Sequence, residues 1–147
     1  MRTAFIGALA ALTMLIVGCA AVPMGDPAMD AQLKTFAPVP EKARLYVYRN
    51  ETFGAAIKMP VLLDGRILGD TAAQTYLFAE IDPGNHRLIS KTENDAILDW
   101  TAVAGRIYYV WQEVKMGLFA ARSHLQLVDE KTGQAGVLES KLAKTEK

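Results

Sequence analysis

The chain has 147 residues, 51% of them hydrophobic, and its 16 Lys and Arg balance its 16 Asp and Glu. This length suits one domain around a single apolar core. The balanced charge argues against nucleic acid as a partner, and no polybasic segment is available to attract anionic lipid. Cys19 is the sole cysteine, which excludes a disulfide framework and a cysteine-based metal site. We expect no metal and no cofactor.

The N-terminus has the order of a bacterial lipoprotein signal. Arg2 supplies a positive charge, an uncharged apolar stretch follows, and the stretch closes with Leu15-Ile16-Val17-Gly18-Cys19. Small residues surround the bond between Gly18 and Cys19, as a cleavage site requires. We therefore predict that residues 1–18 are a signal peptide, and that Cys19 is lipidated and becomes the mature N-terminus.

Lipoproteins that resemble this signal carry a diacylglyceryl thioether and an N-acyl chain, and such multiple chains make the anchor effectively permanent. An Asp after the cysteine tends to retain such proteins in the inner membrane. Here that position is Ala20, which favours the periplasmic face of the outer membrane. Two alternatives stay open: an uncleaved anchor over residues 3–22, or cleavage after Ala21 that releases a soluble periplasmic domain.

Residues 19–42 are expected to form a tether between the lipid and the domain. Pro23, Pro27, Pro38 and Pro40 interrupt regular hydrogen bonding along this segment. A short helical turn is expected between Met29 and Phe36. The alternative is that the segment packs on the domain.

Residues 43–147 are expected to form a mainly β domain. Short runs rich in β-branched and aromatic residues alternate with turn signals, of which Asp64-Gly65 is the strongest hairpin signal. We expect strands at residues 44–49, 60–63, 66–69, 75–81, 86–91, 96–103, 106–114 and 124–128. This spacing predicts an antiparallel β-sandwich, or a partly open barrel, of about 7–8 strands. The spacing of Val137, Leu138 and Leu142 adds a short C-terminal helix.

Aromatic residues recur at alternate positions of the expected strands. Leu45 and Val47 share one face of the first strand, and Tyr46 and Tyr48 share the other. We expect the aromatic side chains to fill the space between two sheets, with a face that stacks sugars or peptides as the alternative. The set comprises Tyr46, Tyr48, Tyr76, Phe78, Tyr108, Tyr109 and Trp111.

Four segments of this domain together resemble a known bacterial family. They are Leu45-Tyr46-Val47-Tyr48-Arg49, Pro60-Val61-Leu62-Leu63-Asp64-Gly65, Asp82-Pro83-Gly84-Asn85-His86 and Gly105-Arg106-Ile107-Tyr108-Tyr109-Val110. The chain from Ala43 to about Gly133 resembles the family called domain of unknown function 2846. The resemblance implies an exported, β-rich lipoprotein and supplies no catalytic residues. The hairpin and the Pro-Gly-x-His turn are also similar to small β-sandwich modules of the PEGA type.

Candidate catalytic residues are few. His86 follows a turn and is expected to hydrogen-bond its own loop, while His124 is expected at the surface. Glu80 and Glu113 lie within expected strands. An envelope hydrolase that uses Glu80, Glu113 or His86 is the alternative function, and it needs these side chains in one cleft.

The candidate interaction loop spans Met116 to Ala121 and includes Leu118 and Phe119. Such an apolar loop needs a partner or a membrane if it is exposed. The alternative is a bulged strand or helical turn that closes the core. The sequence thus predicts a lipid-anchored envelope protein with a non-catalytic binding or structural module. Its expected partners are the membrane, through the lipid, and other envelope proteins or cell-wall polymer.

Overall fold

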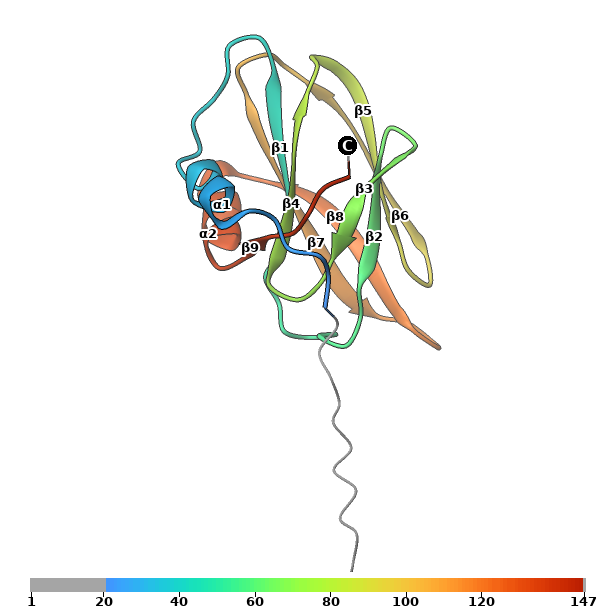
Figure 1. Ribbon diagram of the computed structural model, residues 1–147. Helices are drawn as coiled ribbons and strands as arrows, with labels where there is room; N and C mark the ends of the chain where they lie inside the picture. The colour runs from blue at the N-terminus through green and yellow to red at the C-terminus, as the bar shows by residue number, and fades with distance from the viewer. Residues whose placement is uncertain (1–20, 147) are drawn as a thin grey trace, which may run out of the picture.

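The computed structural model describes residues 21–146 (Figure 1). Within that range the chain forms two helices, α1 (Pro27–Leu33) and α2 (Glu130–Leu138). The strands are β1 (Ala43–Arg49), β2 (Met59–Leu63), β3 (Arg66–Thr71), β4 (Thr75–Ile81), β5 (Gly84–Lys91), β6 (Asp95–Ala102), β7 (Ile107–Met116), β8 (Ala121–Val128) and β9 (Lys141–Leu142).

The strands form two sheets that face each other. One has the order β8-β7-β1-β4-β9 and the other the order β3-β2-β5-β6. The sheets are not closed into a barrel, so the predicted sandwich with a C-terminal helix is confirmed. Most pairs are antiparallel, but β1 pairs in parallel with β7, and β4 with β9. This departs from a purely antiparallel sandwich, because the chain crosses to the second sheet twice before β7 arrives beside β1.

The hairpin between β2 and β3 turns at Asp64 and Gly65, as predicted. Their φ angles are 51° and 80°. Both central positions of the favoured two-residue hairpin turn require positive φ, which explains the Asp-Gly pair.

Two apolar layers cover the two faces of the five-stranded sheet. Leu45 and Val47 of β1 belong to the core between the sheets. Tyr46 and Tyr48 belong to a second core on the opposite face. The helices α1 and α2 lie over that face of the sheet (Figure 1). That second core consists of Leu33, Tyr46, Tyr48, Tyr76, Phe78, Tyr109, Val137 and Leu142, with Phe36, Ile107, Trp111 and Val128 packed at its edge.

The expectation that the aromatic residues fill the space between the sheets is therefore wrong for all but one of them. Tyr108 packs against the core between the sheets, and the others lie beneath α1 and α2. The period-two pattern separates the faces of a strand correctly. It does not reveal which face meets the second sheet and which meets a helix.

The segment before β1 packs on the domain from Val22 onward. Val22 is buried in the core between the sheets, and the Gly25 N–H donates to the Leu142 carbonyl over 2.9 Å. The side chain of Asp26 caps α1, which covers part of the turn predicted at residues 29–36. The expected tether therefore belongs to the folded domain from Val22 onward.

Residues 1–18 and Cys19 lie outside the described residues. Neither described helix has the length and hydropathy needed to cross a bilayer.

Helix α2 lies close to the sheet because two of its residues are glycines. A Cβ atom at Gly133 would come within 2.2 Å of Tyr109, and one at Gly136 within 2.1 Å of Tyr48. Both contacts are far inside van der Waals distance. The sheet therefore requires glycine at these two positions of the helix.

His86 joins two turns at one end of the four-stranded sheet. Its Nδ1 lies 2.7 Å from Asp64 Oδ2, and its Nε2 lies 2.7 Å from the Asp82 carbonyl. Both partners accept hydrogen bonds, so both nitrogens donate only when the ring is protonated. Burial lowers the pKa of His86, but the hydrogen bonds and charges of Asp82 and Asp64 outweigh it and the pKa is raised.

Replacing Gly136 by Ala should destabilise the protein. We expect the free energy of unfolding to fall by about 1–3 kcal/mol from overpacking, even though Ala favours helix by about 1 kcal/mol over Gly. Urea unfolding measures the change. Lys131→Ala, at an exposed position of the same helix, is the control and should change stability by less than about 0.5 kcal/mol. A Gly136→Ala protein as stable as the wild type would contradict the packing described here.

His86 should make stability depend on pH. Because its pKa is raised in the folded state, its contribution is complete below the ordinary value of 6.5 and is lost as the pH rises through the folded-state pKa. The difference in unfolding free energy between wild type and His86→Gln should therefore shrink as urea titrations move from acid to alkaline pH. His124→Gln, which replaces a side chain that is 58% exposed, controls for the loss of a histidine. A difference that stays constant with pH would refute the proposed charge state.

Candidate functional site

Of the three side chains named for a hydrolase, Glu80 and His86 line one open hollow of about 540 Å³ between the two sheets, whereas Glu113 lies elsewhere. Glu80 on β4 accepts a hydrogen bond from Arg44 of β1 over 3.2 Å. His86 lies on β5, in the other sheet. Glu113 lies on β7, and β1 separates β7 from β4. The structure therefore brings Glu80 and His86 to one hollow and leaves Glu113 outside it. Within that hollow Glu80 is bound to Arg44, and His86 to Asp64 and the Asp82 carbonyl.

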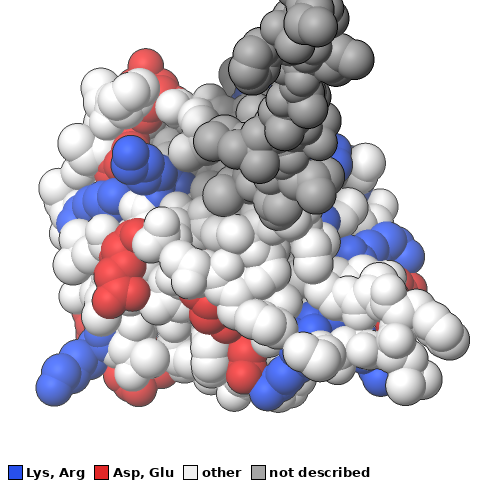
Figure 2. Space-filling model, turned by 90° about the horizontal axis from the view of Figure 1, so that it is seen from below, with Lys and Arg blue, Asp and Glu red and all other residues white. Residues whose placement is uncertain are grey.

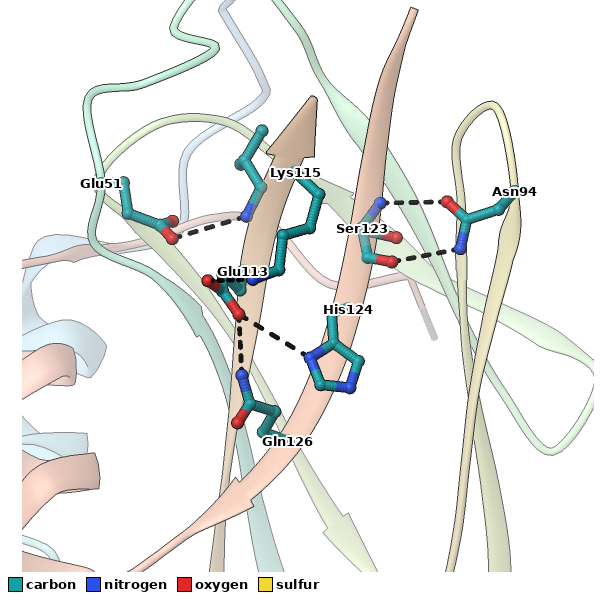
Figure 3. Close-up of polar contacts among 8 residues, drawn as sticks. Glu51, Asn94, Glu113, Lys115, Ser123, His124 and Gln126 are labelled. Atoms are coloured by element: carbon teal, nitrogen blue, oxygen red, sulfur yellow. Dashed lines mark hydrogen bonds and ion pairs between the residues drawn. The ribbon is translucent and has the colours of Figure 1, made fainter. Parts of the chain in front are cut away.

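Glu113 is the centre of a polar cluster on the outer face of β7 and β8 (Figure 3). Its carboxylate accepts hydrogen bonds from Lys115 over 2.6 Å and from Gln126 over 2.8 Å. His124 Nδ1 lies 3.7 Å from the same carboxylate. Among the described residues no three His, Cys, Asp or Glu side chains are grouped closely enough to hold a metal ion.

Ser123 and His124 point to opposite faces of β8, as expected for neighbours on a strand. His124 faces Glu113 and solvent, whereas Ser123 is buried and its backbone bonds to the side chain of Asn94 in both directions (Figure 3). These two residues therefore cannot act as a serine–histidine pair.

A buried Arg holds the loop between β1 and β2, a role that the sequence analysis missed. The side chain of Arg49 is fully buried and donates to the carbonyls of Gly54 and Ile57 over 2.5 and 2.7 Å. Glu51 accepts a hydrogen bond from the Val114 N–H of β7 over 3.4 Å. Burial lowers the pKa of Arg49 and raises that of Glu51. In the sequence Arg49 looks like an ordinary end of a strand, so nothing marks it as buried.

The β7–β8 tip, Met116 to Ala120, carries the most exposed large apolar side chains of the described residues. Met116 is 80% exposed, Leu118 87% and Phe119 96%. The alternative that this loop closes the core is wrong, because the loop protrudes beyond the sheet. Phe53, 53% exposed, faces the tip across a shallow groove of about 290 Å³. The groove is further lined by Gly54, Ile57, Val114 and the tip itself.

Glu93, from the turn between β5 and β6, holds the backbone of the β7–β8 tip. Its carboxylate accepts hydrogen bonds from the N–H groups of Leu118, Phe119 and Ala120, over 3.3, 2.9 and 2.8 Å. The bonds from Phe119 and Ala120 lower the pKa of Glu93. With the backbone bound to the other sheet, the apolar side chains of the tip are directed outward.

Gly117 is required by this arrangement. A Cβ atom at this position would lie 2.1 Å from the Ala120 carbonyl and 2.6 Å from the Glu93 carboxylate. The sequence shows an apolar loop and, separately, an acidic turn. To predict that the loop and the turn meet, one must know the register of both sheets, and the sequence alone does not reveal it.

Comparison with known proteins agrees with the resemblance drawn from the sequence. An uncharacterized protein of Haemophilus influenzae is 27% identical over 135 residues, which cover 90% of this chain and 80% of that protein. No solved structure matches the chain. The model of a family described as "Protein of unknown function (DUF2846)" matches residues 40–124, from β1 into β8 and including the β7–β8 tip. The chain therefore belongs to the DUF2846 family.

Proposed function

We propose that this protein is a lipoprotein of the cell envelope, anchored through Cys19 at the periplasmic face of the outer membrane. Its β-sandwich is a non-catalytic binding module, and the β7–β8 tip is its binding surface. The lipoprotein signal that ends at Gly18-Cys19 supports the anchor. The exposed apolar tip supports the binding role.

The β7–β8 tip is the observation that carries the proposal. Burying a Leu or Phe side chain stabilises a protein by about 1.5–3 kcal/mol, so leaving Leu118 and Phe119 in water forgoes that gain. Exposed apolar patches of this kind mark contact surfaces. The hydrogen bonds from the tip backbone to Glu93 order the tip before it meets a partner, and this lowers the entropic cost of binding.

The hydrogen bonds that already engage each candidate catalytic side chain support a non-catalytic module. A general acid and base must both reach one substrate. Glu113 is paired with Lys115 and Gln126, away from the other two candidates. Glu80 and His86 share a hollow, but Glu80 is paired with Arg44, and His86 with Asp64 and the Asp82 carbonyl. Each pairing also serves the fold, because it links neighbouring strands, residues of one strand or, for His86, two turns.

The anchor predicts a specific processing step. Globomycin, which blocks the lipoprotein signal peptidase, should make a heavier precursor accumulate, and mass spectrometry of the native protein should show an acylated Cys19 at its N-terminus. Cys19→Ala should abolish lipidation and release the protein from the membrane fraction. A mature protein that begins after Ala21, or that carries a free thiol at Cys19, would contradict the anchor.

The binding surface predicts contacts at the β7–β8 tip in living cells. Phe119 replaced by the photoreactive amino acid benzoylphenylalanine should form crosslinked adducts on illumination. The matched control replaces Val103, which is 50% exposed in the turn between β6 and β7 at the other end of the sandwich. Both positions are exposed, so neither change should unfold the domain. An equal yield of adducts at the two positions would contradict a binding role for the tip.

A further inference from the structure

We infer that the β7–β8 tip inserts into the same lipid leaflet that holds the acyl chains of Cys19. The partner of the tip is thus a phospholipid surface, and the domain touches the membrane at two points. This inference rests on the proposed lipidation of Cys19. It names the partner of the binding surface proposed above.

Chain length places the anchor close to the sandwich. Cys19 precedes Ala21 by two residues, and two extended residues span at most about 7 Å. Ala21 and the buried Val22 line one hollow with residues 72–74, the turn between β3 and β4. Acyl chains on Cys19 therefore hold this end of the sandwich against the bilayer, with no long tether between them.

Strand register places the β7–β8 tip at that same end. Thr75, which follows the β3–β4 turn, lies opposite Arg49, the last residue of β1. β7 runs parallel to β1 with Trp111 beside Tyr48, so residues 113–116 extend past the end of β1 in the same direction. Figure 1 shows the first described residues and the tip of the β7–β8 hairpin at one end of the molecule. The β1–β2 loop with Phe53 emerges there too.

The chemistry of the β7–β8 tip matches a phospholipid surface. Lys115 and Arg122 lie opposite each other in register and are exposed directly behind the apolar residues. Such long cationic side chains reach phosphates while apolar neighbours enter the acyl region. Figure 2, which views this end, shows an uncharged lobe at the lower right, on the side where Figure 1 places the tip, with Lys and Arg side chains beside it.

The hydrogen bonds to Glu93 also satisfy backbone N–H groups of the tip that would be costly to leave unpaired in lipid. An N–H group that enters lipid without a partner is costly, because no water is present to accept its hydrogen. The N–H groups of Leu118, Phe119 and Ala120 already donate to Glu93, on the domain side of the tip. The side chains of Leu118 and Phe119 can therefore enter the acyl region while these three donors stay paired.

Depth-dependent quenching of tryptophan fluorescence tests the inference. The full-length lipidated Phe119→Trp protein is placed in vesicles of phosphatidylethanolamine and phosphatidylglycerol with brominated acyl chains, and the emission of the wild type is subtracted. Val103→Trp, at the opposite end, is the matched control. A tip buried about 5–10 Å into the interface should be quenched roughly threefold more strongly than the control.

The outcomes separate this inference from the proposed function. Stronger quenching at position 119 supports insertion, together with lipid adducts on the benzoylphenylalanine at that position. If the protein floats with the vesicles and both tryptophans are quenched equally, the inference is wrong while the anchor stands; a protein adduct at position 119 then identifies a protein partner. If the protein does not float and Cys19 is unmodified, the proposed anchor fails and the inference fails with it.

Discussion

The burial of β1 on both faces is the constraint on which the rest of the structure depends. Leu45 and Val47 are buried between the sheets, and Tyr46 and Tyr48 are buried beneath the helices. The outer face also positions the N-terminal segment, because the Tyr46 hydroxyl donates to the Leu33 carbonyl over 2.8 Å. Neighbouring Tyr76 donates to Asp30 of α1 over 2.7 Å. The path of the chain back to Ala21 is therefore set by aromatic side chains of the sheet.

A polar link through the core fixes the position of β7. Gln112 is fully buried; its amide donates to Ser90 of β5 over 2.7 Å, and its carbonyl accepts from Thr71 of β3 over 2.5 Å. A buried amide without partners would be costly, so these bonds favour one register of β7 against the second sheet. The same register decides how far the strand projects as a hairpin, and hence where Leu118 and Phe119 stand.

The strands and turns were predictable because local signals specify them. Asp64-Gly65 encodes a tight hairpin by its backbone preference, and the alternation from Arg44 to Arg49 assigns each side chain to the correct face. The second layer was not predictable, since α2 approaches the sheet through Gly133 and Gly136, and neither glycine signals a partner in the sequence.

The candidate site was predictable only as an apolar segment. Leu118 and Phe119 stand out in the sequence, but whether they close the core or leave it depends on contacts with distant residues. Glu93 lies in the turn between β5 and β6 of the other sheet and accepts from backbone N–H groups. Almost every residue type carries such a group, so no residue in the tip signals this contact. Arg49 is a charged residue whose burial is possible because carbonyls of the following loop fold back over it. Interactions between side chains and distant backbone leave no pattern in a single sequence.

The parallel pairing of β1 with β7 has a consequence for how the chain acquires its structure. β1 is the first strand within the described residues, yet its two neighbours, β4 and β7, come later in the chain. Pairing between distant segments must wait until both are present, and loop closure makes it slow. A polypeptide is made from its N-terminus, so the apolar residues of β1 stay uncovered until β7, and with it most of the chain, has been made.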